Sequence, residues 1–578
     1  MQDGVSLRAP GFCNVNQLFE GPNEIAERIE VFRGPNSSVY GSNAVHGVIN
    51  IITPVPGAGN NYISIETGPD DFYRSKLGFS TESIRVDFSG SHDDGYKDDS
   101  GYGQQKLLVK HSGQLQGWEI NSSLFLSNLN QETAGFISGF EAYRAEEQKK
   151  ENPNPEAYRD AYSLRIMSDL SKEIRGATIN IQPYLRSAGM KFLQHFLPGQ
   201  PEERNGHDSF GLSLVAQSNR WWSFGADIEF TQGFLKETQE NAVQGSRFLS
   251  ATLPPGKHYD YEVDASLFGL FIRAEHPLSE KASISGGARL QYTNYRYDNK
   301  MVDGRTKEDG TNCGFGGCRF SRPSDREDSF SNLSPNIGFI YKFNSSSQAY
   351  ASLARGFRAP QTTELYRLQN QQEVANIDEV ELDSIEIGFR SQGERSVFSI
   401  SAFSMKKDNF IFRDTQRQNV DSGETRHQGL ELALDYQINP RLSTSTSFSY
   451  AKHQYDNNLV VRDEHVKIDT FTSATVVVGT VQTDELGVAE ILPSYASNTI
   501  SFVEGDPSGT GSSHNDFIRD SNKQFVIEGF TEGMTITASG ASNGANNRDY
   551  EIVKVTSDEI TLVPVDDVVA ESASNTIT

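Results

Sequence analysis

Two cysteines in a long polar segment are the residues whose spacing most clearly predicts a covalent bond. Cys313 and Cys318 bracket the residues Gly-Phe-Gly-Gly, a span flexible enough to fold back and bring two sulfur atoms together. Because an exposed pair in an oxidising compartment oxidises readily, we expect a disulfide that stiffens an extracellular loop. A free pair in a disordered loop is the alternative. The charged neighbours that can then meet an anionic ligand are Arg319, Arg322, Asp325 and Arg326.

No other spacing indicates catalysis or a bound cofactor. The histidines are scattered, and no Ser-His-Asp, Cys-His or His-x-x-x-His arrangement accompanies a plausible scaffold. The acidic segment DDGYKDD (93–99) has the composition of a calcium-binding loop but lacks the required ligand order. The sequence therefore predicts a protein that is not an enzyme and has no metal site and no cofactor.

The elements that must position these residues read as β-strands. From about residue 60 to 455 the chain falls into segments of roughly ten residues in which apolar and polar side chains alternate, about 18 in all. Very short linkers alternate with long polar ones at 131–160, 235–260, 297–330 and 358–380. Short turns on one rim and long loops on the other are typical of a transmembrane antiparallel β-barrel.

Composition narrows the class of protein. A net charge of −25 argues against a nucleic-acid partner, because phosphate backbones are bound by clustered Lys and Arg. Hydrophobic residues make up only 36% of the chain, and no apolar run approaches the roughly 18 residues of a spanning helix. A transmembrane barrel tolerates this composition, since alternate residues face lipid and a wet lumen. Composition alone also leaves open a large soluble secreted β protein.

Residues 27–54, which read ERIEVFRGPNSSVYGSNAVHGVINIITP, differ from the strands that follow. We expect a short amphipathic helix at about 22–27, a strand at 28–32, a Gly-Pro turn and a second, apolar strand. This segment resembles the closing stretch of the plug domain in bacterial TonB-dependent receptors. Two barrel segments of the same family are similar to ARGFRAPQTTELYRL (354–368) and to LDSIEIGFR paired with QGLELALDY.

The resemblance implies an all-β transmembrane barrel, of about 22 strands in the family, with a small α/β plug inside it. It also implies three parts: the C-terminal part of the plug at 1–58, the barrel at 59–460 and an unrelated acidic β-rich tail at 461–578. By this comparison the sequence starts inside the plug. We therefore expect the signal peptide, the TonB box and the first half of the plug to be absent from this chain.

The function implied by the resemblance is uptake of a scarce nutrient across the outer membrane of a Gram-negative bacterium. A ferric siderophore or similar metal chelate is the commonest cargo of the family, while haem, cobalamin and oligosaccharide use the same scaffold. The implied partners are the metal-chelate or other small-molecule ligand, outer-membrane lipid and a TonB-type energy-transducing complex.

The resemblance also assigns roles to individual residues. Plug arginines face barrel glutamates in the family, which makes Arg33, Glu386 and Glu431 the expected plug–barrel lock. Separately solvated charges are the alternative. The stretch at 8–16 occupies the place of a plug apex loop, where Cys13 is expected to be a small buried residue. The candidate ligand contacts in this stretch are Arg8, Phe12, Asn14 and Asn16.

Beyond about residue 465 the composition changes to Thr, Ser, Val, Gly and Asp. The string ASNTI occurs at 496–500 and again at 573–577, which suggests a repeated β unit. Residues 518–565 read as five or six short strands, and they faintly resemble β modules of phage structural proteins. Two alternative functions follow: a surface or virion-like structural protein that acts through this module, and a fragment that does not transport.

Overall fold

The computed structural model describes residues 1–12, 19–57, 61–139, 141–218, 221–414, 417–456, 482–483, 489–490, 495–504, 516–526, 530, 533–563 and 568–572. The chain forms two compact units. One consists of Met1–Thr133 and Asn154–Asn458, and the other of Ala134–Pro153 and Leu459–Thr578.

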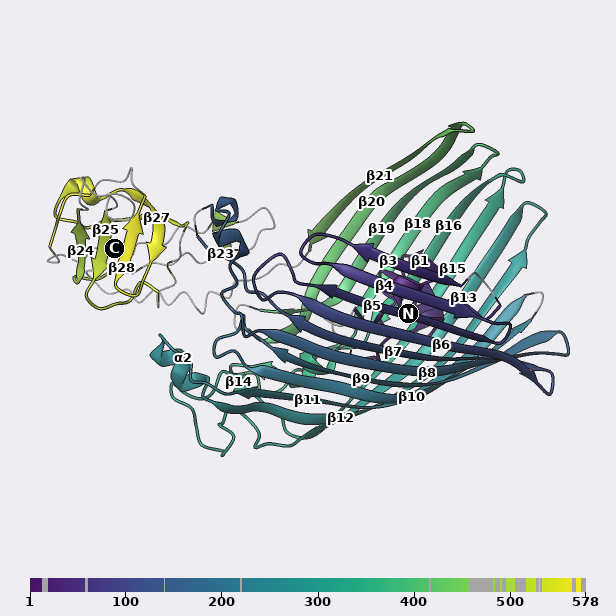
Figure 1. The fold of residues 1–578 in the computed structure, drawn as a ribbon, viewed down its shortest axis with the longest axis horizontal. Coiled ribbons are helices and arrows are strands. Elements are labelled where there is room, and N and C mark those ends of the chain that lie inside the picture. Colours follow the sequence, from purple (N-terminus) through teal and green to yellow (C-terminus); the bar gives the residue numbers. More distant parts are fainter. Residues whose placement is uncertain are drawn as a thin grey trace. The chain divides into compact units, whose positions relative to one another are not determined.

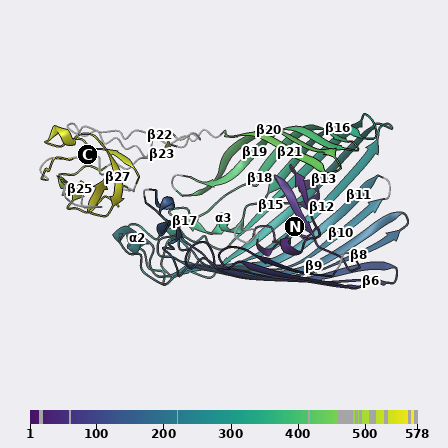
Figure 2. The ribbon, with the colours of Figure 1, turned by 45° about the horizontal axis from the view of Figure 1, so that its top comes forward.

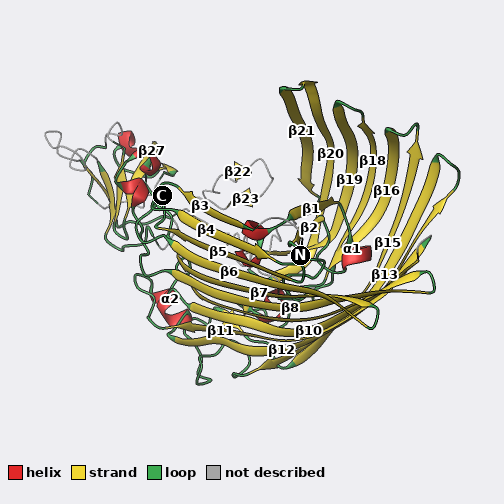
Figure 3. Ribbon diagram, turned by 45° about the vertical axis from the view of Figure 1, so that its right-hand side comes forward, coloured by secondary structure: helices red, strands yellow, loops and turns green. Residues whose placement is uncertain are grey.

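Seventeen antiparallel strands of the first unit make one barrel, in which each strand pairs with the next along the chain (Figures 1 and 3). They are β3 (Tyr62–Thr67), β4 (Tyr73–Ser80), β5 (Ile84–Asp93), β6 (Tyr102–Leu115), β7 (Trp118–Glu132), β8 (Tyr158–Ile174), β9 (Ala177–Leu193), β10 (Glu202–Ser218), β11 (Trp222–Gln239), β12 (Gly256–Pro277), β13 (Ala282–Asn299), β15 (Arg326–Lys342), β16 (Ser347–Arg358), β18 (Val380–Gln392), β19 (Ser396–Arg413), β20 (Asn419–Asn439) and β21 (Leu442–Tyr455). The barrel fold predicted from the alternating pattern is confirmed.

The alternation is inverted relative to a soluble protein, as β11 shows. Phe224 and Phe230 are about half exposed on the outer surface, whereas Glu229 and Thr231 are buried in the lumen. Lipid solvates the aromatic side, and hydrogen bonds in the lumen satisfy the polar side. Because successive side chains of a strand point to opposite faces, one alternating sequence builds both the apolar, lipid-facing surface and the polar interior.

The strands are longer than the sequence pattern indicated, because they extend into both ends of the segments predicted as loops. The predicted loop at 235–260 is in fact strand at both ends, with the helix α2 (Arg247–Thr252) in the remaining connection. The connection after β16 carries the helix α3 (Thr362–Tyr366), and the two-residue strands β14 (Phe320–Ser321) and β17 (Leu368–Gln369) pair with each other. No helix among the described residues combines the length and the apolar character needed to cross a membrane.

The plug, residues 1–12 and 19–57 of the described chain, lies in the lumen (Figure 2). Its strands β1 (Arg28–Arg33) and β2 (Gly47–Ile52) pair antiparallel, and the helix α1 (Ser37–Tyr40) connects them. The helix expected at 22–27 is only a single 3₁₀ turn at Asn23–Ile25, because Ala26 is already extended.

In the second unit, a five-stranded sheet has the order β24 (Ile500–Val503), β25 (Phe517–Asp520), β28 (Glu559–Leu562), β27 (Asp549–Val555) and β26 (Thr535–Thr537). It buries a core of its own around Phe502, Tyr550 and Leu562. Two further short strands, β22 (Gln482–Thr483) and β23 (Ala489–Glu490), pair with each other. The second ASNTI copy lies outside the described residues.

Candidate functional site

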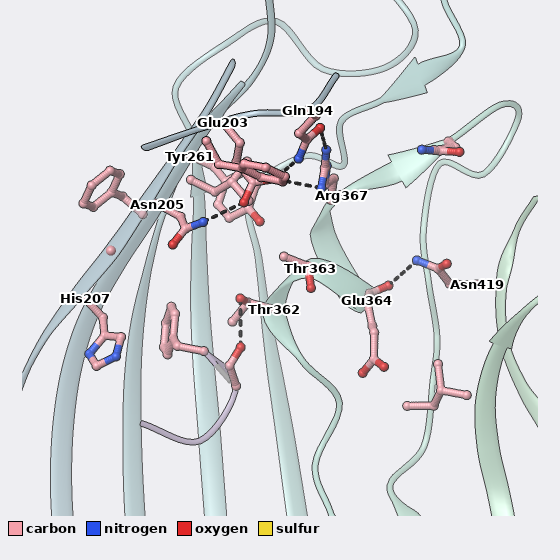
Figure 4. Close-up of a pocket in the computed structure, with 18 of the residues that line it drawn as sticks. Gln194, Glu203, Asn205, His207, Tyr261, Thr362, Thr363, Glu364, Arg367 and Asn419 are labelled. Carbon is pink, nitrogen blue, oxygen red and sulfur yellow. Dashed lines mark hydrogen bonds and ion pairs between the residues drawn. The ribbon is translucent and has the colours of Figure 1, made fainter. Parts of the chain in front are cut away.

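A cavity of about 570 Å³ lies where the first residues of the plug meet the barrel strands and α3. Its wall is rich in aromatic side chains and contains three arginines. The aromatic residues are Phe12, Phe192, Phe196, Phe234, Tyr261 and Phe412, and the arginines are Arg8, Arg367 and Arg413. Figure 4 shows part of this wall, with α3 and Arg367 on one side and the strand that carries His207 on the other.

Close packing between plug and barrel forms the floor of the cavity. The backbone N–H of Thr362 and its hydroxyl both donate to the carbonyl of Gly11, at 2.9 and 3.0 Å. Gly11 has a φ of +86°, and a Cβ built on it would lie 2.6 Å from the hydroxyl oxygen of Tyr295. Only glycine tolerates both this conformation and this approach, so the apex turn is held in place.

The three arginines of the cavity differ in how far they are neutralised. Arg367 pairs with Glu203 at 2.9 Å and with Glu237. Burial opposes the charged form, but Glu237 and Glu203 outweigh it and raise the pKa of Arg367. Arg413 donates from Nε to Asn419 at 3.2 Å, and within the described residues it takes part in no ion pair. Arg413 is therefore the cation best placed to meet a ligand.

Below the cavity, two lysines of β6 hold the plug. Lys106 donates to the carbonyl of Gly21 and to a carboxylate oxygen of Glu24, each at 2.7 Å, and its side chain is 2% exposed. Lys110 donates to the carbonyl of Thr53 at 3.1 Å. Charges this deeply buried are stable only when they are paired and hydrogen-bonded, and the plug supplies these partners.

Two arginines extend this hold on β8 and β9. Arg165 donates to the side chain of Gln2 at 2.9 Å and to the carbonyl of Glu20 at 2.8 Å. Arg186 donates to the carbonyl of Ser6 at 2.7 Å. We call Lys106, Lys110, Arg165 and Arg186 the lumen cations.

A buried carboxylate of the plug completes this network. Glu20 is fully buried and pairs with Arg8, whose Nε lies 3.3 Å from Oε2. Burial raises the pKa of Glu20, although Arg8 and Arg165 oppose that shift. Because its guanidinium is committed to Glu20, Arg8 orders the plug apex more than it offers charge to the cavity.

The structure brings together part of the expected lock. Arg33 forms an ion pair with Glu431, with side chains 71% and 30% exposed. Glu386 instead accepts a hydrogen bond from the hydroxyl of Tyr350 at 2.5 Å. Arg33 is thus paired with one of the two predicted carboxylates.

The predicted ligand residues fall into three groups. Arg8 and Phe12 line the cavity, while Asn14 and Asn16 lie outside the described residues, as does Cys13. Arg322 is buried and gives its donors to the carbonyls of Val302, His258 and Thr306.

The loop around Cys313 and Cys318 lies outside the cavity wall. The two cysteines are joined by a disulfide, with their Cα atoms 4.9 Å apart. Arg319 contacts the ring of Phe248 and does not line the cavity either.

A family model described as TonB dependent receptor-like, beta-barrel matches residues 54–522. The chain belongs to this family. Its members are receptors and transporters of the Gram-negative outer membrane, not enzymes, and they act with the TonB system on small-molecule ligands. The match runs past residue 460, and the likeness of the tail to phage modules remains an expectation.

Solved structures share the fold at low identity. The siderophore receptor PiuA from Acinetobacter baumannii is 12% identical over 96% of this chain and 85% of its own, with a TM-score of 0.60. The copper transporter OprC is 15% identical over 79% of this chain and 71% of its own, with a TM-score of 0.60. The ferric citrate transporter FecA, in its unliganded form, is 15% identical over 79% and 69%, with a TM-score of 0.62.

The lumen cations of this TonB-dependent receptor were missed from sequence, although a signal for them exists. Lys106 and Lys110 are four residues apart in an alternating strand, so both point to the same side as Leu108 and away from Leu107 and Val109. Basic residues on the lumen side of a barrel strand need a partner inside, and the plug is that partner.

Proposed function

We propose that this TonB-dependent receptor takes up a ferric siderophore or a similar metal chelate, and that the cargo binds in the cavity at the plug apex. The observation that carries the proposal is the chemistry of the cavity wall, which combines aromatic side chains with Arg413, an arginine that takes part in no ion pair among the described residues. Ferric chelates often combine flat conjugated ligands with a net negative charge. Rings and an arginine recognise both features by stacking and by charge-assisted hydrogen bonds.

The size of the cavity is consistent with this cargo. A volume of about 570 Å³ lies within the range of roughly 300–1,000 Å³ that is usual for small-molecule sites. Phe12 of the plug and Tyr261 of β12 both line it. A bound cargo would therefore contact plug and barrel together, as signalling to the periplasmic side requires.

The same proposal assigns a separate role to each of three parts of the chain. Residues 1–58 act as the plug, 59–460 as the barrel and 461–578 as a separate acidic module. The energy-transducing TonB complex and outer-membrane lipid are the macromolecular surroundings in which the receptor works.

Binding by the purified full chain in detergent tests the proposal. Titrations followed by tyrosine and tryptophan fluorescence would compare a ferric tris-catecholate, ferric citrate, haem and cobalamin. We expect a ferric chelate to bind most tightly. Losing one charge-assisted hydrogen bond costs about 1.5–3 kcal/mol, so Arg413→Gln should raise its Kd by about 10- to 150-fold.

Arg296→Gln is the matched control. This arginine lies on the outer surface of β13, where it pairs with Asp264 at 3.5 Å, and its loss should leave the Kd unchanged. If the Arg413→Gln variant bound the ferric chelate with the same Kd as the unaltered protein, the cargo would not bind in this cavity. Tighter binding of cobalamin or haem than of every ferric chelate would overturn the cargo class.

A further inference from the structure

The plug is held unequally by the two sides of the barrel. On one side, β6, β8 and β9 direct the four lumen cations at carbonyl and carboxylate oxygens of the plug. We call β6–β9 the anchoring wall. Further along, the backbone N–H of Phe357 on β16 donates to the hydroxyl of Ser37 at 3.1 Å, so the hold extends to that strand.

The four strands β18–β21 make a different kind of contact with the plug. The contacts described from the plug to this open wall are the exposed ion pair of Arg33 with Glu431 and a ring contact of His46 with His427 at 5.8 Å. An ion pair this exposed contributes little, because water screens both charges. The open wall therefore contacts the plug only weakly.

A second cavity, of about 980 Å³, lies between β1 and the open wall. It is lined by Val31 and Arg33 of β1, and by Ser401 and Ser449 of β19 and β21. The short turn after Lys342 and the end of β18 at Gln392 also border it, so it reaches the rim with the short turns. Val31 and Ile49 remain about 60% exposed on this side of the plug sheet.

We propose that the transported solute passes the plug between β1 and β18–β21, while the anchoring wall keeps the plug in the barrel. Moving the plug away from the open wall separates one exposed ion pair and a ring contact. Moving it away from the anchoring wall would leave the buried cations Lys106, Lys110 and Arg165 without their plug partners, which is far costlier. Arg186 would lose its plug carbonyl but keep its ion pair with Glu229 of β11. The proposal rests on the proposed function only for the identity of the solute.

Cysteine accessibility tests the path without any cargo. In a Cys13→Ser background, Ser401→Cys and Ser449→Cys place a thiol on the open wall, while Ser163→Cys and Ser209→Cys place one on the lumen side of β8 and β10. A small charged methanethiosulfonate would be added to the folded full chain in liposomes, and labelling followed by mass. We expect the two open-wall thiols to react at least about tenfold faster, because Ser163 and Ser209 are buried.

Equal labelling of the two pairs, or protection of both open-wall thiols, would overturn the proposal. Because no ferric chelate is present, this outcome is independent of the binding test above. A receptor that binds cobalamin could still show the open-wall path, and a ferric receptor could lack it.

Two arginine variants test the anchor separately. Arg165→Met removes a guanidinium that the anchoring wall directs at the plug, and Arg33→Met removes the plug guanidinium that pairs with Glu431 of the open wall. The readout is hydrogen exchange of the Ile51 amide, which donates to the carbonyl of Met1 at 3.0 Å. We expect at least about tenfold faster exchange in Arg165→Met and less than about twofold in Arg33→Met. Equal acceleration in both would contradict the unequal hold, and the thiol test remains decisive if Arg165→Met does not fold.

Discussion

The anchoring wall and the open wall are built from similar antiparallel strands, yet their inward faces differ in charge and burial. The anchoring wall buries lysine and arginine side chains that reach plug carbonyls. The open wall presents small serines and leaves Arg33 of the plug 71% exposed. One barrel can thus fix an internal domain on one side and leave a wet space on the other.

The physical basis of this difference is desolvation. A buried cation must replace all of its water with protein acceptors, so its contacts are lost together and at high cost. An exposed pair recovers hydration as it separates. Burial, more than the number of ion pairs, therefore decides which side of the plug can move.

The largest effect is expected for Lys106→Met. It leaves Glu24 without its cation and the carbonyl of Gly21 without a donor, which should lower the free energy of opening the plug by about 3–5 kcal/mol. Hydrogen exchange of residues 19–25 measures that free energy. Lys300→Met is the control: its exposed pairs with Asp298 and Glu262 should be lost without measurable change. A loss below about 1 kcal/mol at Lys106 would argue that the lysine is not an anchor.

Two glycines of the plug have a positive φ but differ in the space around them. Gly41 and Gly34 have φ values of +75° and +72°, but a Cβ on Gly41 would lie 2.6 Å from Oε1 of Gln291, whereas Gly34 has open space. Alanine should cost about 1–2 kcal/mol at Gly34 for the positive φ. It should cost more at Gly41, because a ψ of −153° with this φ is essentially restricted to glycine, and because the clash adds about 1–3 kcal/mol. Plug exchange rates in Gly41→Ala and Gly34→Ala give the difference directly, and equal losses would show that the turn is not packed against β13.

Acid should loosen the contact of the plug with the open wall. Desolvation, and then Lys407, His427 and His453, lower the pKa of His46 to about 4, whereas a solvated histidine titrates near about 6.5. The seated plug therefore binds a proton less readily than a released one. The contribution of His46 to seating is complete above pH 6.5, falls as the pH drops from about 6.5 to 4, and changes no further below that.

A nitroxide on Val31→Cys reports this loosening through its mobility, measured near neutral pH and at about pH 5. We expect higher mobility in acid, and a smaller response in His46→Asn. The same response in both proteins would place the sensor elsewhere.

Much of the barrel was predictable from sequence, because a lipid-facing strand needs an apolar residue at every second position. That period identified the barrel and gave about 18 strands, against seventeen barrel strands among the residues that the structure describes. Strand ends were less predictable, as at 235–239, because polar residues above the membrane continue the sheet without an apolar signal. The plug was identified by the resemblance of residues 27–54.

The candidate site was only partly predictable. Sequence pointed to Arg8 and Phe12 through the position of the apex loop, and both line the cavity. It could not place Arg367 or Arg413 beside them, since β19 and the segment after α3 converge only through the closure of the sheet. Nor could the sequence show that Arg8 already forms an ion pair with the carboxylate of Glu20.

The smallest effect is expected at Arg33 and Glu431, two members of the plug–barrel lock that the family resemblance implied. Arg33→Gln and Glu431→Gln should each change the free energy of plug opening by at most about 1 kcal/mol, and a double-mutant cycle should give a coupling in the same range. Glu386→Gln should leave the plug unaffected, because this carboxylate accepts its hydrogen bond from Tyr350 of the barrel. Hydrogen exchange of the Ile51 amide measures the free energy of plug opening in the three single variants and in the double variant. A coupling above about 2 kcal/mol would mean that the open wall also grips the plug, and the distinction between the two walls would fail.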